Sequence, residues 1–171
     1  MGSYDSELND YLSDMHLLSK VAILDNIQDI YSLMNERFPF YGTKIDFESL
    51  HVREYKISHE KFLKNDVLEF VQEVLANKYN INLNTTIIYF GDDLLDKGYK
   101  TTIKTLKEFI GFSIENIPQH HYIVTDSVDW CLFVEFENNI YFGFAKFDKL
   151  NPKPDGTDFG GIYDDPDFTV W

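Results

Sequence analysis

The sequence contains a single cysteine, Cys131, so no disulfide can form within the chain. No basic segment leads into an apolar run at its start, which argues against a secretory signal. The apolar stretches are far shorter than the roughly 20 residues that a membrane-spanning helix needs. No linker rich in proline, glycine and serine occurs before residue 151. These absences predict a reduced, cytoplasmic protein whose residues 1–171 form a single domain.

Basic residues are scarce, since 15 lysines and arginines face 29 aspartates and glutamates and leave a net charge of −14. Residues 1–50 carry nine acids and three bases, and residues 151–171 carry five acids and one base. The excess therefore lies mainly at the two ends. Such a charge repels nucleic acids and anionic membranes and attracts basic proteins. The alternative is an acidic surface that is simply well solvated.

The motifs of common catalytic sites are also missing. The patterns GxSxG, GxxxxGK[ST], GxGxxG and HExxH do not occur. Cys131 lies in an apolar run, where a nucleophile is not expected. His121 with Asp126 or Asp129 forms one alternative metal site, because these residue types bind divalent metals. The sequence therefore predicts a protein that is not an enzyme and has no metal or cofactor, with a small metal-dependent hydrolase as an alternative.

Apolar residues at helical spacing predict helices over residues 4–18, 19–38, 58–75 and about 101–110. The first pattern is weak, and we expect residues 1–20 to be a weakly ordered start. Ser19 and Ser58 are candidate N-caps. Pro39 should end the second helix, and Gly111 is a candidate C-cap for the last one.

Strands are predicted by β-branched and aromatic runs. One or two short strands fall within residues 44–57, and others cover residues 85–90, 121–125, 130–137 and 140–146. From Trp130 to Phe136, alternate residues should face the core, while the other set ends in Glu135 and Glu137 facing water. Asn138 and Asn139 should form a two-residue turn. The predicted fold is α+β, with N-terminal helices packed on an antiparallel sheet that includes a C-terminal meander with one buried face.

Residues 147–171 are punctuated by proline and glycine but also contain several aromatic residues. We expect this segment to pack along the body as an extended C-terminal arm with its acids on the surface. A tail without fixed structure is the alternative.

The stretch from Ile117 to Ala145, IPQHHYIVTDSVDWCLFVEFENNIYFGFA, resembles the C-terminal part of bacterial toxin-immunity proteins. The shared texture is a strand, a short acidic turn, a tryptophan that opens the next strand, a tight turn and an aromatic strand with a glycine. These immunity proteins protect cells from polymorphic and contact-dependent growth-inhibition toxins. The resemblance implies a small, acidic, cytoplasmic protein that binds one cognate toxin, often a basic nuclease, as a monomer in a 1:1 complex.

A binding protein of this kind needs exposed acids and aromatic side chains. The residues that we predict to contact the partner are Asp92, Asp93, Asp96, Asp155, Asp158, Phe159, Tyr163, Asp164, Asp165, Asp167 and Trp171. A non-catalytic adaptor or structural interaction domain, which binds a partner without neutralising a toxin, remains an alternative.

Overall fold

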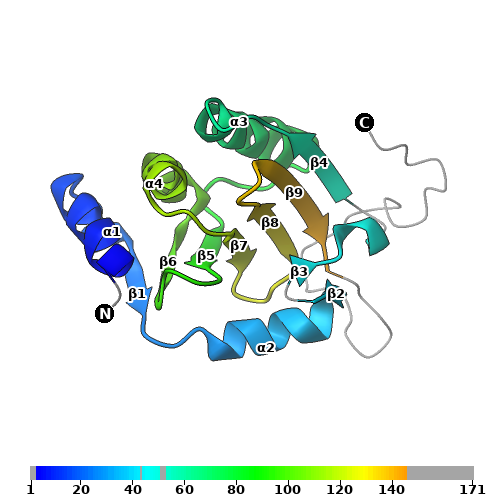
Figure 1. The fold of residues 1–171 in the computed structure, drawn as a ribbon, viewed down its shortest axis with the longest axis horizontal. Helices are drawn as coiled ribbons and strands as arrows, with labels where there is room; N and C mark the ends of the chain where they lie inside the picture. The colour runs from blue at the N-terminus through cyan, green and yellow to red at the C-terminus, as the bar shows by residue number, and fades with distance from the viewer. Residues whose placement is uncertain (1–2, 43, 51–52, 146–171) are drawn as a thin grey trace.

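A computed structural model describes residues 3–42, 44–50 and 53–145 of the chain. Its central feature is an antiparallel sheet of seven strands in the order β1-β6-β5-β7-β8-β9-β4 (Figure 1). These strands are β1 (Ala22–Leu24), β4 (Arg53–Ile57), β5 (Thr86–Gly91), β6 (Gly98–Thr102), β7 (His121–Thr125), β8 (Trp130–Val134) and β9 (Asn139–Phe144). A separate hairpin consists of β2 (Phe40–Tyr41) and β3 (Lys44–Ile45).

The helices are α1 (Ser3–Asp14), α2 (Gln28–Arg37), α3 (Leu63–Phe70), which continues as a π-helix over Val71–Lys78, and α4 (Ile103–Asn116). Single 3₁₀ turns occupy Leu18–Lys20 and Phe47–Ser49. This combination of helices with one large antiparallel sheet confirms the predicted α+β class. Within the described ranges, no helix combines the length and the apolar character that crossing a bilayer requires.

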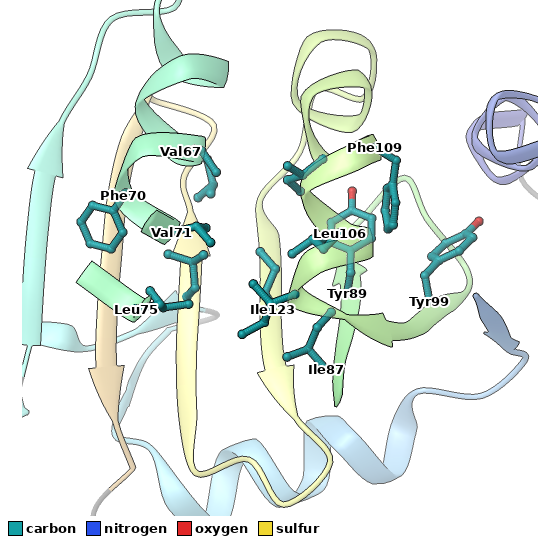
Figure 2. Packing of buried hydrophobic residues seen from close by; sticks show 14 of the residues in the cluster. Val67, Phe70, Val71, Leu75, Ile87, Tyr89, Tyr99, Leu106, Phe109 and Ile123 are labelled. Carbon is teal, nitrogen blue, oxygen red and sulfur yellow. The ribbon is translucent and has the colours of Figure 1, made fainter. Parts of the chain in front are cut away.

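Helices cover both faces of the sheet. Helices α1, α3 and α4 lie on one face, while α2 and the β2–β3 hairpin lie on the other (Figure 1). Each face of the sheet therefore has its own hydrophobic core. The first core lies under α1, α3 and α4, and the second core lies under α2 and the β2–β3 hairpin. Because side chains alternate along a strand, Ile87 and Tyr89 enter the first core, and Ile88 and Phe90 enter the second. In Figure 2 the ring of Tyr89 stands on the sheet with its hydroxyl pointing toward the helix layer.

The prediction of a meander with one buried face is wrong. All five residues of β8 are buried, with Trp130 in the first core and Cys131 and Phe133 in the second. The second face is covered because α2 and the β2–β3 hairpin pack on it. Phe136, expected in the core, is 57% exposed because the strand ends at Val134 and the chain turns there.

The β8–β9 turn also differs from the prediction. Glu135 pairs with Asn139, and the three residues Phe136, Glu137 and Asn138 lie between them. Asn138 adopts a positive φ of 71°, as a three-residue hairpin turn with a left-handed last position requires. The predicted tolerance of asparagine for this conformation was correct, but the turn is one residue longer than expected.

The second predicted helix begins too early. Ala22–Leu24 forms an edge strand against β6, and α2 starts only at Gln28, so Ser19 is not its N-cap. Pairing with Gly98–Lys100 takes these residues out of the helix, a tertiary contact that periodicity cannot reveal. The end of α2 before Pro39 is as predicted.

The last predicted helix is displaced along the chain. Residue 101 belongs to β6, Thr102 caps α4 by accepting a hydrogen bond from the Thr105 amide, and the helix runs past Gly111 to Asn116. Gly111 therefore lies in a helix interior against the Lys64 side chain of α3 and is not a C-cap. Ser58 likewise caps no helix, because α3 begins at Leu63 and the Ser58 hydroxyl donates to Asp66.

Helix α1 packs more firmly than its weak pattern indicated. Leu8 and Leu12 are fully buried in the first core, and Tyr11 stacks on Phe112 of α4. The Asp5 side chain is also fully buried, where it accepts hydrogen bonds from the Tyr99 hydroxyl at 2.8 Å and the Asp96 amide at 2.9 Å. This helix, which its weak periodicity left poorly defined, is thus buried through one apolar and one polar set of contacts.

Candidate functional site

Four connections meet at one end of the sheet, which we call the loop end. They are the β5–β6 loop (92–97), the segment before β7 (117–120), the β8–β9 turn (135–138) and the β4–α3 connection (58–62). The strand register brings them together, since Gly91 pairs with His121, His121 with Val134, and Ile57 with Asn139. Antiparallel neighbours therefore place segments that are far apart in sequence on one surface.

The β5–β6 loop contributes three exposed carboxylates to the loop end, those of Asp92, Asp93 and Asp96. Asp92 accepts a hydrogen bond from the His120 amide at 3.1 Å, which ties the loop to the segment before β7. The structure therefore brings these three predicted residues together at one end of the sheet, and their contact with a partner stays a prediction.

The other predicted contact residues are in the C-terminal arm. Asp155, Asp158, Phe159, Tyr163, Asp164, Asp165, Asp167 and Trp171 lie outside the described residues. The loop end, as the structure describes it, lies within residues 58–138 and contains none of these eight.

A cleft of about 780 Å³ opens at the loop end. Its walls come from the start of α3, the end of α4 and the β8–β9 turn, and its floor contains Gln119 and His121. A volume of this size falls within the range of ordinary ligand and peptide sites. Among the described residues, no predicted partner contact lines it, although His121, considered as a metal ligand, does. The other lining residues come from connections whose proximity depends on the sheet.

A second hollow of about 410 Å³ lies between the β2–β3 hairpin and the sheet, lined in part by Tyr41, Phe47 and Tyr141. Glu135 lines both hollows and so marks the place where they adjoin. Its carboxylate accepts hydrogen bonds from Lys44 at 2.7 Å and from Asn139 at 2.7 Å. Burial alone would raise the pKa of Glu135, but these two donors outweigh it and lower the pKa.

Large apolar side chains are unusually exposed around these hollows. The exposed fractions are 70% for Ile57, 52% for Phe62, 57% for Phe136 and 85% for Tyr41. Ile57, Phe62 and Phe136 belong to connections of the loop end or flank them, and Tyr41 lines the second hollow. Single exposed apolar residues need no explanation, but a group beside a cleft is typical of binding surfaces. The aromatic pattern in the sequence indicated core positions and missed this group.

Most basic side chains of the described residues form ion pairs within the protein. Eight basic side chains contact carboxylates, namely Lys20, Arg37, Lys44, Lys56, Lys64, Lys78, Lys97 and Lys100. Such pairs add little stability at the surface, but they leave the surplus charge on the remaining acids. Among the described residues, no basic group lies within ion-pair distance of Glu60 or Asp93 at the loop end. Asp96 interacts electrostatically with Lys97, which forms its ion pair with Asp25.

His121 lies at the floor of the cleft and is buried. Its Nδ1 shares a hydrogen bond of 2.9 Å with the Tyr89 hydroxyl. Burial, assisted by the neighbouring His120, lowers the pKa of His121 from 6.5 to about 3. An imidazole with this pKa is neutral near pH 7 and too weakly basic to serve as an efficient general base.

The structure does not bring together the residues of the alternative metal site. His121 begins β7, whereas Asp126 follows its end and Asp129 precedes β8 at the same far end of the sheet. There Asp126 pairs with Lys100 at 2.5 Å and Asp129 pairs with Arg37 at 3.1 Å. Across the described part of the chain, no three His, Cys, Asp or Glu residues gather in a way that would hold a metal ion.

His121 gives the folding stability a defined dependence on pH. Between pH 6.5 and about 3, the unfolded chain binds a proton that the folded imidazole excludes. This contribution to the free energy of unfolding is complete above pH 6.5 and falls below it by up to about 1.4 kcal/mol per pH unit. Urea titrations at pH 7 and pH 5 should show an acid loss about 2 kcal/mol larger for the wild type than for His121→Gln. Equal losses would contradict this assignment.

Comparison with known proteins leaves the family open, since no protein-family model and no curated protein matches this chain. Burial raises the pKa of the Cys131 thiol, so the reactive thiolate is disfavoured, and the imidazole at the cleft is held neutral. What the loop end offers instead is a set of unpaired carboxylates, exposed apolar side chains and two adjoining hollows.

Proposed function

We propose that this protein binds a basic partner protein through the loop end. The observation that carries the proposal is the coincidence of three features on one surface: carboxylates without a basic partner, exposed apolar anchors, and a cleft. Acidic groups accelerate the encounter with a basic protein, and apolar side chains in well-packed pockets supply most of the affinity.

The partner that we propose is a cognate bacterial toxin, with a basic nuclease as the favoured class. The resemblance of residues 117–145 to toxin-immunity proteins supplies this part of the proposal. A carboxylate surface suits the role, because the active surface of a nuclease is built to attract phosphates and is therefore positive. Acids of the loop end would occupy that surface and exclude the nucleic acid. The resemblance also implies a 1:1 complex in the cytoplasm.

A basic protein encoded beside this chain would be the partner to test. Co-expression should protect cells from its toxicity, and purified proteins should form a 1:1 complex. The Asp93→Lys/Asp96→Lys variant should associate about tenfold more slowly, because it reverses charge in the β5–β6 loop. Stopped-flow mixing at low ionic strength measures this rate.

A matched control carries the same charge change elsewhere. Glu36 and Glu73 are exposed on α2 and on the π-helix, away from the loop end. The Glu36→Lys/Glu73→Lys variant should change the association rate by less than about twofold. If both variants slow association equally, the loop end has no special role. Complex formation without protection would favour the adaptor alternative.

A further inference from the structure

The walls of the cleft are richer in acids than in bases. The lining contains two lysines, Lys61 and Lys64, and four glutamates, Glu60, Glu115, Glu135 and Glu137. Lys64 is already engaged by Glu115 at 3.2 Å, and Lys61 lies over the Phe62 ring at 5.7 Å. The basic groups of the walls are thus committed to local contacts, and a surplus of negative charge faces the cleft.

One cationic side chain of the protein itself already binds carboxylates at the edge of the cleft. The Lys44 ammonium lies 2.7 Å from Glu135 and 3.6 Å from Glu137. These contacts raise the pKa of Lys44, mainly through the hydrogen bond to Glu135. Glu135 is therefore occupied, whereas Glu137 is only weakly engaged and Glu60 has no basic partner among the described side chains.

Gln119 supplies an independent feature on the floor. Its residue is 4% exposed, and its Oε1 accepts hydrogen bonds from the amides of Leu94 at 2.8 Å and Leu95 at 3.2 Å. These two donors fix the orientation of the side-chain amide, so the other atom is the Nε2 donor. In the described part of the chain, no acceptor completes a hydrogen bond with Nε2. The Tyr89 hydroxyl lies nearby. Burial raises the pKa of that phenol, and the nearby Gln119 side chain offsets part of the rise. A buried amide donor without an acceptor costs about 1–3 kcal/mol, which a ligand carbonyl can recover.

We propose that the cleft receives a protruding basic loop of the partner, with an arginine as its central side chain. In this arrangement the guanidinium is bound by Glu60 and Glu137, its flat face lies against Phe136, and a backbone carbonyl of the loop accepts from Gln119 Nε2. The inference rests on the proposed function, because it specifies how a basic partner would enter the loop end. It specifies the cleft as the site, arginine as the side chain that enters it, and Gln119 Nε2 as the donor that recognises the peptide backbone.

Arginine fits these features better than lysine. Its planar guanidinium offers five donors and can bind two carboxylates at once, whereas an ammonium acts as a point charge. It also stacks on aromatic rings, and Phe136 presents such a ring at the cleft. A lysine-containing loop should therefore bind more weakly at the same net charge.

Peptide titrations of the full chain test this inference without the natural partner. The probe is an acetylated, amidated Gly-Arg-Gly peptide, compared with Gly-Lys-Gly and Gly-Glu-Gly. With ¹⁵N-labelled protein, the arginine peptide at millimolar concentration should shift the Gln119 side-chain amide and the backbone amides of residues 136–138. The Glu60→Gln/Glu137→Gln variant should weaken this binding about tenfold. The Glu36→Gln/Glu73→Gln variant, with the same charge change away from the loop end, should weaken it less than about twofold.

Gln119→Glu separates hydrogen bonding from simple charge attraction. The variant keeps acceptors for the Leu94 and Leu95 amides, removes the Nε2 donor and adds a negative charge. If charge alone attracted the peptide, binding would tighten, whereas the inference predicts weaker binding of the arginine peptide. Circular dichroism of each variant before titration establishes that the fold is kept.

Several outcomes overturn the inference. Absent or diffuse shifts with the arginine peptide, equal binding of the lysine peptide, or tighter binding by Gln119→Glu would each do so. If the natural toxin binds and is neutralised equally well by Glu60→Gln/Glu137→Gln, the proposed function stands and the cleft is not its contact. If the peptide binds in the cleft but no toxin does, the cleft stands as a site and the proposed function fails.

Discussion

The Asp5→Ala variant should unfold with a free energy about 3–5 kcal/mol below that of the wild type. Asp5 is fully buried and accepts hydrogen bonds from the Tyr99 hydroxyl and the Asp96 amide. Removing the carboxylate leaves two donors without an acceptor in the interior, and each unsatisfied group costs about 1–3 kcal/mol. The change also detaches α1 from the β5–β6 loop, so its buried leucines lose part of their support. Urea unfolding followed by circular dichroism measures the loss.

Three further variants define the origin of this loss. Asp10→Ala changes an exposed acid on the same helix and should alter stability by less than about 0.5 kcal/mol. Asp5→Asn should fall between, because its amide can accept from only one of the two donors. In a double-mutant cycle, Tyr99→Phe should recover about 1 kcal/mol or more of the Asp5→Ala loss, since it removes one unsatisfied donor. Equal effects of Asp5→Ala and Asp10→Ala would contradict the role of the buried carboxylate.

Gly91→Ala should destabilise the protein by about 2–4 kcal/mol. A Cβ at this position would lie 2.0–2.2 Å from the amide group of Gln119, which covers the Gly91 backbone. Gln119 would then have to leave its place and abandon the amides of Leu94 and Leu95. Because that amide also forms part of the cleft floor, the same variant should broaden or shift the resonances of the β5–β6 loop in an NMR spectrum.

Gly111→Ala is the matched control for this substitution. The new Cβ would approach Lys64, with the nearest atom at 2.6 Å, but that atom is near the end of a flexible side chain that can move. Alanine is favoured over glycine in a helix interior by about 1 kcal/mol, so the net change should lie within about 1 kcal/mol of zero. Loss of stability by Gly111→Ala as large as that of Gly91→Ala would show that crowding at Gly91 is not the cause.

Part of the candidate site was accessible from the sequence. The acids of the β5–β6 loop follow a clear strand and precede a glycine, so their exposure could be predicted from turn chemistry. The cleft could not, because Glu60, Gln119 and Glu137 come from separate connections that only the strand register brings together. Phe136 was assigned to the core by alternation, since the pattern does not reveal that the strand stops at Val134.

The fold divides in the same way. Local information was enough where a strand or helix is specified by its own residues, as in β5, β7 and the end of α2 before Pro39. It failed where a neighbour decided the outcome, as in Ala22–Leu24, which became a strand by pairing with β6. Periodicity also assigned one buried face to the meander, because a pattern reports burial of side chains and not which element covers them.

The sequence by itself determined the class of the fold, the acidic character and the lack of familiar catalytic motifs, because these depend on composition and on contacts within short segments. Only the tertiary structure decided that the sheet is covered on both faces, that the neutral His121 lies apart from Asp126 and Asp129, and that acids, aromatics and an unsatisfied amide share one end. Those properties arise from antiparallel pairing between distant segments, and pairing energy is set by partners that no local window contains.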